Sequence, residues 1–133
     1  MKLTRAIVFF TVIILAASCA GGPVHIPDNL TPMELIQMAQ EASERNRYAV
    51  SIQYYEAILQ RFPHDVDNVC AAEYEIAFIH YKQKNYALAR EGFNNLLERY
   101  NFPDAALLPQ QFRILSNIVL EKIDEAEASS RRR

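Results

Sequence analysis

The sequence predicts an all-α fold in which two antiparallel helical hairpins are followed by a fifth helix. The first observation is a self-match, because a shift of 38 residues aligns seven positions with identical or similar residues. These pairs are Ala39 and Ala77, Tyr48 and Tyr86, Ala49 and Ala87, Tyr55 and Phe93, Leu59 and Leu97, Arg61 and Arg99, and Phe62 and Tyr100. The second is the spacing of apolar residues by three and four, which is typical of amphipathic helices. A period of this length indicates a helical repeat array, whose units stack because none buries its apolar face alone.

The first hairpin has clear start and stop signals. Thr31, Pro32 and Glu34 form a predicted capping box with proline at the first helical position, so the first helix is expected over residues 31–45. Pro63 ends the second helix, expected over residues 48–62, because proline cannot continue a helix.

The second hairpin repeats this plan, with helices expected over residues 68–83 and 86–100. Gly92 lies inside the fourth helix, where glycine costs about 1 kcal/mol relative to alanine. Close packing against a neighbouring helix would account for it.

The fifth helix, expected over residues 109–126, is apolar on more than one side. Its apolar residues span roughly 240° of an ideal helical wheel, which is wider than one buried stripe requires. Either this helix is buried on two sides, or its surface at Ile114, Ile118 and Leu120 awaits a partner.

The N-terminus has the pattern of a signal peptide. Lys2 and Arg5 precede an apolar run over residues 6–17, and small residues follow. The run is shorter than the roughly 20 residues of a membrane-spanning helix. The sequence Leu-Ala-Ala-Ser-Cys, ending at Cys19, resembles the lipobox of bacterial lipoproteins, although Leu15 stands four residues before the cysteine and the usual leucine stands three before. Looser boxes of this kind occur in some bacteria, spirochaetes among them.

The lipobox resemblance implies that Cys19 carries a lipid anchor and becomes the first mature residue. Ordinary secretion, with Cys19 lost or free, is the alternative. Removal of Lys2 and Arg5 would leave 12 basic residues against 16 acidic ones, a net charge of −4. Ala20 after the cysteine implies, by the same resemblance, the periplasmic face of the outer membrane.

The domain organisation follows from these signals. We expect a signal peptide over residues 1–18, a flexible tether over 19–30, a helical repeat domain over 31–128 and a disordered tail over 129–133. Glycine and proline in the tether and its lack of helical periodicity support the second boundary.

Several function classes have no support in the composition. The formal net charge is −2, and the three arginines at the end form only a short tail, so nucleic-acid binding is not expected. The sequence contains no phosphate-binding glycine loop, no nucleophile elbow and no His-Glu-x-x-His motif, so neither catalysis nor a cofactor is expected. His64, Asp65 and Asp67 are close in one loop but lack converging ligands, so no metal site is predicted. Cys70, the second cysteine, is expected in the core.

The two hairpins resemble tetratricopeptide repeats. The small residues Ala39 and Ala77, the large aromatics Tyr55 and Phe93, and the closing Pro63 carry this resemblance. Departures include Ser51 in place of the usual alanine and a period of 38 rather than 34 residues. The repeats are most similar to those of the BamD-type outer-membrane assembly lipoproteins, which carry about twice as many. The resemblance implies a right-handed superhelix that binds proteins on its concave side.

By this register, the predicted partner-binding residues are Ile36, Gln40, Tyr74, Phe78, Tyr81, Lys82, Arg113 and Asn117. Core packing is the alternative role for the three aromatic residues. The expected function is that of a membrane-anchored adaptor that binds other envelope proteins or their peptides. A structural, self-associating lipoprotein is the alternative, in which Ile114, Ile118 and Leu120 pair two copies.

Overall fold

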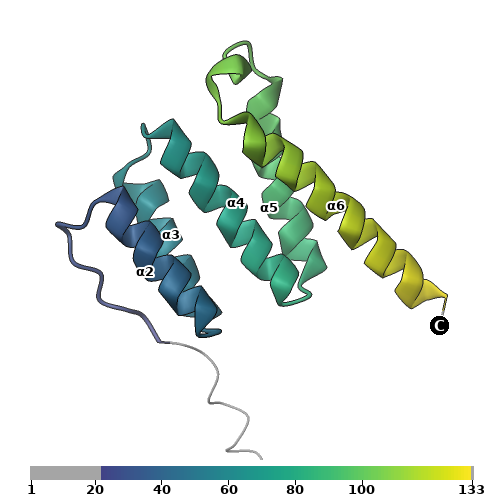
Figure 1. Ribbon diagram of the computed structural model, residues 1–133, viewed down its shortest axis with the longest axis horizontal. Helices are drawn as coiled ribbons and strands as arrows, with labels where there is room; N and C mark the ends of the chain where they lie inside the picture. The colour runs from purple at the N-terminus through teal and green to yellow at the C-terminus, as the bar shows by residue number, and fades with distance from the viewer. Residues whose placement is uncertain (1–21, 133) are drawn as a thin grey trace, which may run out of the picture.

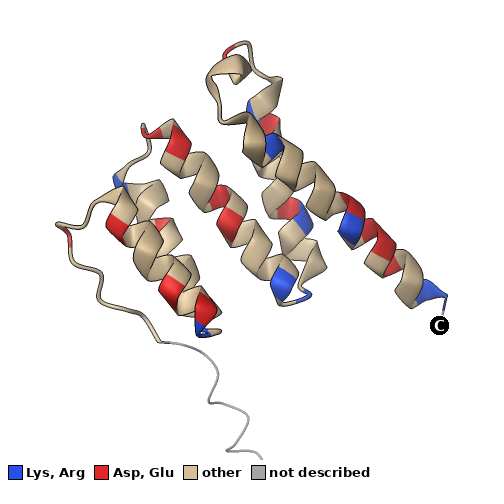
Figure 2. Cartoon of the chain, viewed as in Figure 1, with Lys and Arg blue, Asp and Glu red and all other residues tan. Residues whose placement is uncertain are grey.

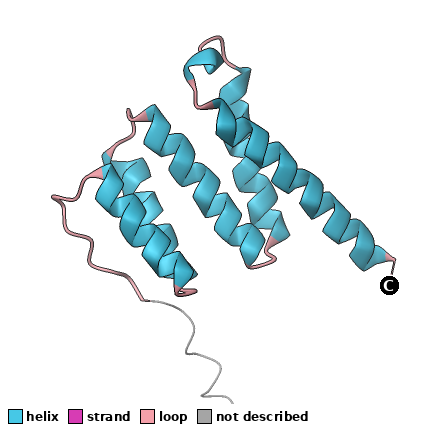
Figure 3. Cartoon of the chain, in the orientation of Figure 1, coloured by secondary structure: helices cyan, strands magenta, loops and turns pink. Residues whose placement is uncertain are grey.

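The computed structural model describes residues 22–132, and this part of the chain contains five α-helices, two short 3-10 helices and no β-strand (Figure 3). The α-helices are α2 (Pro32–Glu44), α3 (Tyr48–Arg61), α4 (Val66–Lys82), α5 (Tyr86–Glu98) and α6 (Gln110–Arg131). Helices α2, α4 and α6 form a front layer, and α3 and α5 lie behind them (Figure 1). The predicted all-α class, with two hairpins and a fifth helix, is confirmed. The predicted signal peptide and Cys19 lie outside the described residues.

The start of α2 has the predicted capping box. Glu34 N donates to Thr31 Oγ1 at 3.3 Å, and Thr31 N donates to Glu34 Oε2 at 2.8 Å. The bond from Thr31 N and a second one from Thr31 Oγ1, both donated to the Glu34 carboxylate, lower the pKa of Glu34 because they favour its charged form.

The turns within the two hairpins have the same geometry. Asn46 and Lys84, which are 38 residues apart, have φ values of 57° and 60°. Residues in this left-handed region commonly end helices. The same hydrogen bond closes both turns, from Arg47 N to Ala42 O at 2.8 Å and from Asn85 N to His80 O at 2.9 Å. The sequence period is therefore also a period of the backbone.

Three helix boundaries differ from the sequence prediction by two residues or more, and the last of them, the end of α6, is described below. Helix α4 begins at Val66, two residues early, because the Asp65 side chain caps it by accepting from Asn68 N at 3.3 Å. Helix α5 ends at Glu98 and continues as the 3-10 helix η2 (Arg99–Asn101). A second 3-10 helix, η3 (Ala105–Leu107), precedes α6.

The core consists of two buried clusters. The first lies among α2, α3 and α4, and its buried members are Leu35, Ala39, Tyr55, Ala57, Ile58, Ala72 and Ile79. The second lies among α4, α5 and α6, and its buried members are Cys70, Tyr74, Ala77, Ala89, Phe93, Leu96, Tyr100, Val119 and Ile123. Helix α4 contributes to both clusters, so it is the shared wall of the domain.

The two hairpins differ in the residues that lie where their paired helices approach each other most closely. In the first, the buried Ser51 hydroxyl donates to Ala39 O at 2.7 Å. In the second, Ala89 stands at the matching position, and Gly92 lies against Ala77. The departure at Ser51 is therefore accommodated by a hydrogen bond between helices, which satisfies the buried hydroxyl.

Residues 22–30 contain no helix, but they are held against α3. Arg61 donates to Pro27 O at 2.7 Å and to Ile26 O at 3.0 Å, and Val24 N donates to the Gln53 side chain at 2.8 Å. The Ile26 side chain packs against the first cluster. The expectation of a flexible tether is therefore wrong for this part of the segment, because its backbone groups and two apolar side chains, Ile26 and Leu30, find partners on the domain.

Helix α6 extends to Arg131, so the predicted disordered tail over 129–133 is wrong for residues 129–131. Arg90 of α5 donates to Asp124 at 2.8 Å and to Glu127 at 3.0 Å. These contacts join the last turns of α6 to α5 and support helix beyond the last apolar residue of the stripe.

Candidate functional site

The candidate site is the side of the domain formed by α2, α4 and α6, which we call the α2/α4/α6 face (Figure 1). On α4 its central residues are Glu75, Phe78 and Lys82. Their spacing of three and four places them on one side of the helix. Figure 2 shows that α4 carries both acidic and basic positions.

Aromatic side chains form a continuous row along α4. The ring centroids of Tyr74 and Phe112 are 5.6 Å apart, and those of Tyr74 and Phe78 are 5.8 Å apart. The row continues from Phe78 to Tyr81 at 5.7 Å and from Tyr81 to Tyr86 at 6.1 Å. Such distances are typical of favourable aromatic pairs. Phe78 and Tyr81 are half-buried, so both side chains are held by the row and reach the surface.

Tyr74 has a different role from the predicted one. It is only 8% exposed, and its ring lies 5.6 Å from that of Phe93 in the second cluster. Burial raises the pKa of its hydroxyl, and the negative charge of Glu75 adds to this effect. The structure places Tyr74 in the core, where it supports Phe78, and this corrects its prediction as a partner-binding residue.

Lys82 connects α2 and α4. Its Nζ donates to Ser43 Oγ of α2 at 2.7 Å and lies 5.1 Å from the Tyr48 ring centroid and 5.6 Å from that of Phe78. A cation over exposed aromatic rings gains about 0.5–1 kcal/mol. These contacts hold the ammonium group in position. Because Lys82 is exposed, the group can still meet an anion or an acceptor.

Glu75 is the half-buried acid of this face. Burial raises its pKa, and the positive charge of Lys82 opposes that rise. No hydrogen bond or ion pair to its carboxylate is present among the described residues. The carboxylate oxygens keep contact with solvent, because neither is among the buried atoms without a hydrogen-bond partner. They therefore remain open to a donor or cation brought by another molecule.

The two predicted residues of α2 lie as expected for the edge of this face. Gln40 is exposed, and Ile36 is half-buried against the first cluster. Ile36 therefore combines packing with partial access to the surface.

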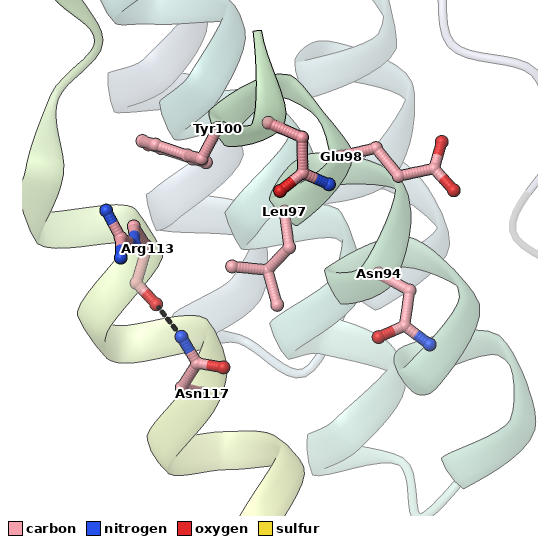
Figure 4. Close-up of a pocket in the computed structure, with 7 residues that line it drawn as sticks. Asn94, Leu97, Glu98, Tyr100, Arg113 and Asn117 are labelled. Atoms are coloured by element: carbon pink, nitrogen blue, oxygen red, sulfur yellow. Dashed lines mark hydrogen bonds between the residues drawn. The ribbon is translucent and has the colours of Figure 1, made fainter. Parts of the chain in front are cut away.

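The prediction that Arg113 and Asn117 belong to the same groove as Phe78 is wrong. Both line a separate groove of about 520 Å³ between α5 and α6 (Figure 4). Its lining residues are Asn94, Leu97, Glu98, Tyr100, Asn101, Arg113 and Asn117. The physical reason is the rotation of α6, because Phe112 faces Tyr74 of α4 and the next residue lies about 100° around the helix.

Sequence reasoning missed Glu75, Ser43 and Leu115. Glu75 shares the side of α4 with Phe78 and Lys82, so helical register could have found it. Leu115 is 40% exposed near Gln111, which lines a shallow pocket of about 400 Å³ between α4 and α6. The sequence offers no comparable signal for Ser43, whose role depends on how α2 and α4 pack.

The exposed apolar surface of α6 differs from the predicted one at one residue. Ile114 and Ile118 are 60% and 43% exposed, as expected for a surface without a partner. Leu120 instead packs against the second cluster and is half-buried, so its assignment to that surface is wrong.

The free cysteine of the described residues, Cys70, lies in the core. Cys70 is fully buried, and burial is the main cause that raises the pKa of its thiol. The protonated thiol is a poor nucleophile. Within residues 22–132 no three His, Cys, Asp or Glu side chains are grouped as metal ligands, and no helix has the length and apolar character of a membrane span.

Comparison with known proteins adds one relative. An uncharacterized protein of Treponema pallidum (strain Nichols) is 32% identical over 108 residues. The aligned region covers 80% of this chain and 43% of the relative, so the chain spans less than half of the relative's length. No family model matches the chain. No solved structure gives a significant match.

Proposed function

We propose that this protein is a lipid-anchored adaptor of the bacterial cell envelope, which binds a segment of another envelope protein on its α2/α4/α6 face. The observation that carries the proposal is the combination at α4 of half-buried aromatic side chains with Glu75, an acid that has no partner among the described residues. Aromatic anchors beside oriented polar groups are common at protein interfaces.

The chemistry of the face favours a peptide with an apolar side chain next to a basic one. The apolar group would cover Phe78, and the basic group would supply the donor that Glu75 lacks. A helical or extended segment could present both, since each places neighbouring side chains at suitable spacings. Lys82 would donate a hydrogen bond to a carbonyl or an acidic group at the edge.

The anchor and the repeat family belong to the same proposal. The lipobox-like sequence at Cys19 supports lipidation, and a relative in Treponema, a spirochaete, is consistent with a looser box. The repeated hairpin turns and the paired positions of Tyr55 and Phe93 support a TPR-like array. Such arrays serve as binding surfaces for other proteins.

A photo-crosslinking experiment in intact cells tests the binding role. A photoreactive phenylalanine analogue replaces Phe78 in one variant and Leu88, an exposed apolar residue of α5, in the control. We expect a discrete crosslinked product from position 78 and none from position 88. Glu75→Gln should reduce that product about tenfold, as expected for loss of a charge-assisted pair of about 1.4 kcal/mol. Equal products from both positions would exclude the adaptor role of this face.

The anchor is tested by feeding labelled palmitate to cells that express the chain. The wild type should incorporate the label and partition with membranes, and Cys19→Ala should do neither. Absence of label in the wild type would leave ordinary secretion as the explanation of the N-terminal sequence.

A further inference from the structure

The outward side of α6 carries a second groove, of about 470 Å³. Its lining residues are Gln110, Arg113, Ile114, Asn117, Ile118 and Glu121. Ile114 and Ile118 are the exposed apolar residues of this groove. In residues 22–132 no other helix covers it. A helix with an exposed apolar pair between polar residues is suited to pairing with another helix.

The matching side of helix α4 shows which kind of neighbour packs against a face with this spacing. The side of α4 that packs on α5 carries Cys70, Tyr74, Ala77 and Tyr81. The same spacing of four, three and four recurs 40 residues later at Gln110, Ile114, Asn117 and Glu121. The opposite sides agree as well, because Ala72 and Ile79 of α4 match the inward-facing Phe112 and Val119 of α6. The groove on α6 therefore corresponds to the surface on which α4 receives an antiparallel helix.

The charged residues of this surface are placed so that two copies of the surface can form ion pairs with each other. Arg113 and Glu121 lie four residues on either side of Asn117, and neither forms an ion pair among the described residues. In an antiparallel pair of α6 helices centred on Asn117, Arg113 of each copy faces Glu121 of the other. A parallel pair would instead place like charges together, which is unfavourable.

We propose that α6 pairs with α6 of a second copy of this chain, in an antiparallel arrangement whose two-fold axis passes near Asn117. Ile114 and Ile118 of both copies fill the centre, and two Arg113–Glu121 ion pairs close the ends. The same patch is used by both copies, as in other two-fold interfaces. One pair of helices buries less surface than a stable dimer usually does, so association in the micromolar range is expected. This inference does not depend on the α2/α4/α6 face.

Sedimentation velocity of the purified full chain in a non-ionic detergent, from about 1 to 100 μM, measures the association. The wild type should shift from one to two copies per particle across this range. Ile118→Asp should abolish the shift, whereas Leu88→Asp should retain it. The two side chains are matched, since Ile118 is 43% exposed and Leu88 is 44% exposed.

Charge reversal tests the arrangement itself. Arg113→Glu and Glu121→Arg should each weaken association about tenfold, because each creates two repulsive contacts. The double variant should restore it, because both ion pairs form again with reversed sign. Circular dichroism verifies that every variant is folded. A wild type that stays monomeric to about 100 μM, or a double variant no better than the single ones, overturns the proposal.

Discussion

Gly92 of α5 lies directly against Ala77 of α4. A Cβ atom added at Gly92 would be 2.8 Å from the Ala77 Cβ and 3.4 Å from its Cα. Contacts between Cβ atoms are essentially never this short, so the helices could accept the atom only by moving apart. The glycine inside α5 is thus explained by the close approach of the two helices in the second hairpin.

Replacement of this glycine tests the contact. Gly92→Ala should gain about 1 kcal/mol in helix propensity. Separation of two packed helices should cost more, within the roughly 1–3 kcal/mol of overpacked cores. We expect a lower midpoint of thermal unfolding, and partial recovery in a double variant with Ala77→Gly. A single variant more stable than the wild type would show that the helices separate at no cost.

Arg61 should decide whether residues 22–28 stay on the domain. Arg61→Ala removes the hydrogen bonds to Pro27 O and Ile26 O and the ion pair to Asp28, whose atoms are 3.5 Å apart. Hydrogen exchange in a peptide that covers this segment should rise about tenfold, since its contacts outside the first cluster are few. Arg45→Ala is the control, because Arg45 contacts only Glu41 on its own helix. Unchanged exchange in Arg61→Ala would mean that the packing of Ile26 and Leu30 and the hydrogen bond from Val24 N to Gln53 are enough to hold the segment.

Glu75 should make stability depend on pH in a defined direction. Its pKa in the folded state is raised above the ordinary carboxyl value of 4.5, so the unfolded chain loses this proton first as pH rises. The contribution of Glu75 is therefore fully favourable below pH 4.5 and declines as pH rises through the folded-state pKa. Glu75→Gln lacks this titration. Denaturant unfolding at several pH values should show the variant gaining stability relative to the wild type from pH 4 to 7, and a constant difference would contradict the assignment.

Arg90 should hold the last turns of α6 in place. Arg90→Ala removes contacts to Asp124 and Glu127, so hydrogen exchange near the end of α6 should increase. The global effect should be small, roughly 0.2–1 kcal/mol, because the ion pairs are partly exposed. Lys122→Ala is the control, because Lys122 occupies an exposed position of α6. If both variants exchange alike, the helix end is stabilised by its own sequence.

Local signals predicted the helices well. The capping box at Thr31 and the repeated turns are set by nearby residues, so they could be read directly from the chain. The end of α6 was missed because Arg90, which contacts its last turns, is distant in sequence. The attachment of residues 22–30 was missed for the same reason, since the donors come from Arg61 at the end of α3, 34 residues after Pro27 in the sequence.

The candidate site was less predictable because it depends on the rotation of each helix. The register of α4 places Phe78 and Lys82 on one side of that helix, where the Lys82 ammonium lies over the Phe78 ring. Arg113 and Asn117 were not placed correctly, because they follow Tyr74 and Phe78 by 39 residues. The correspondence between α4 and α6 is 40 residues, and one residue turns a helix by about 100°. Tyr74 shows the related limit that a helical aromatic stripe alone does not separate surface from core.

The position of α4 as the shared wall has a consequence for how the molecule unfolds. Ala72 and Ile79 on one side, and Ala77 and Tyr74 on the other, belong to different clusters but to one rigid rod. If either hairpin opened, α4 would expose one of its apolar sides while the other remained covered. The energetic penalty of that half-open state couples the two hairpins, as neighbouring repeats are coupled in longer arrays. The domain should therefore unfold in a single calorimetric transition, even though its sequence contains two repeats.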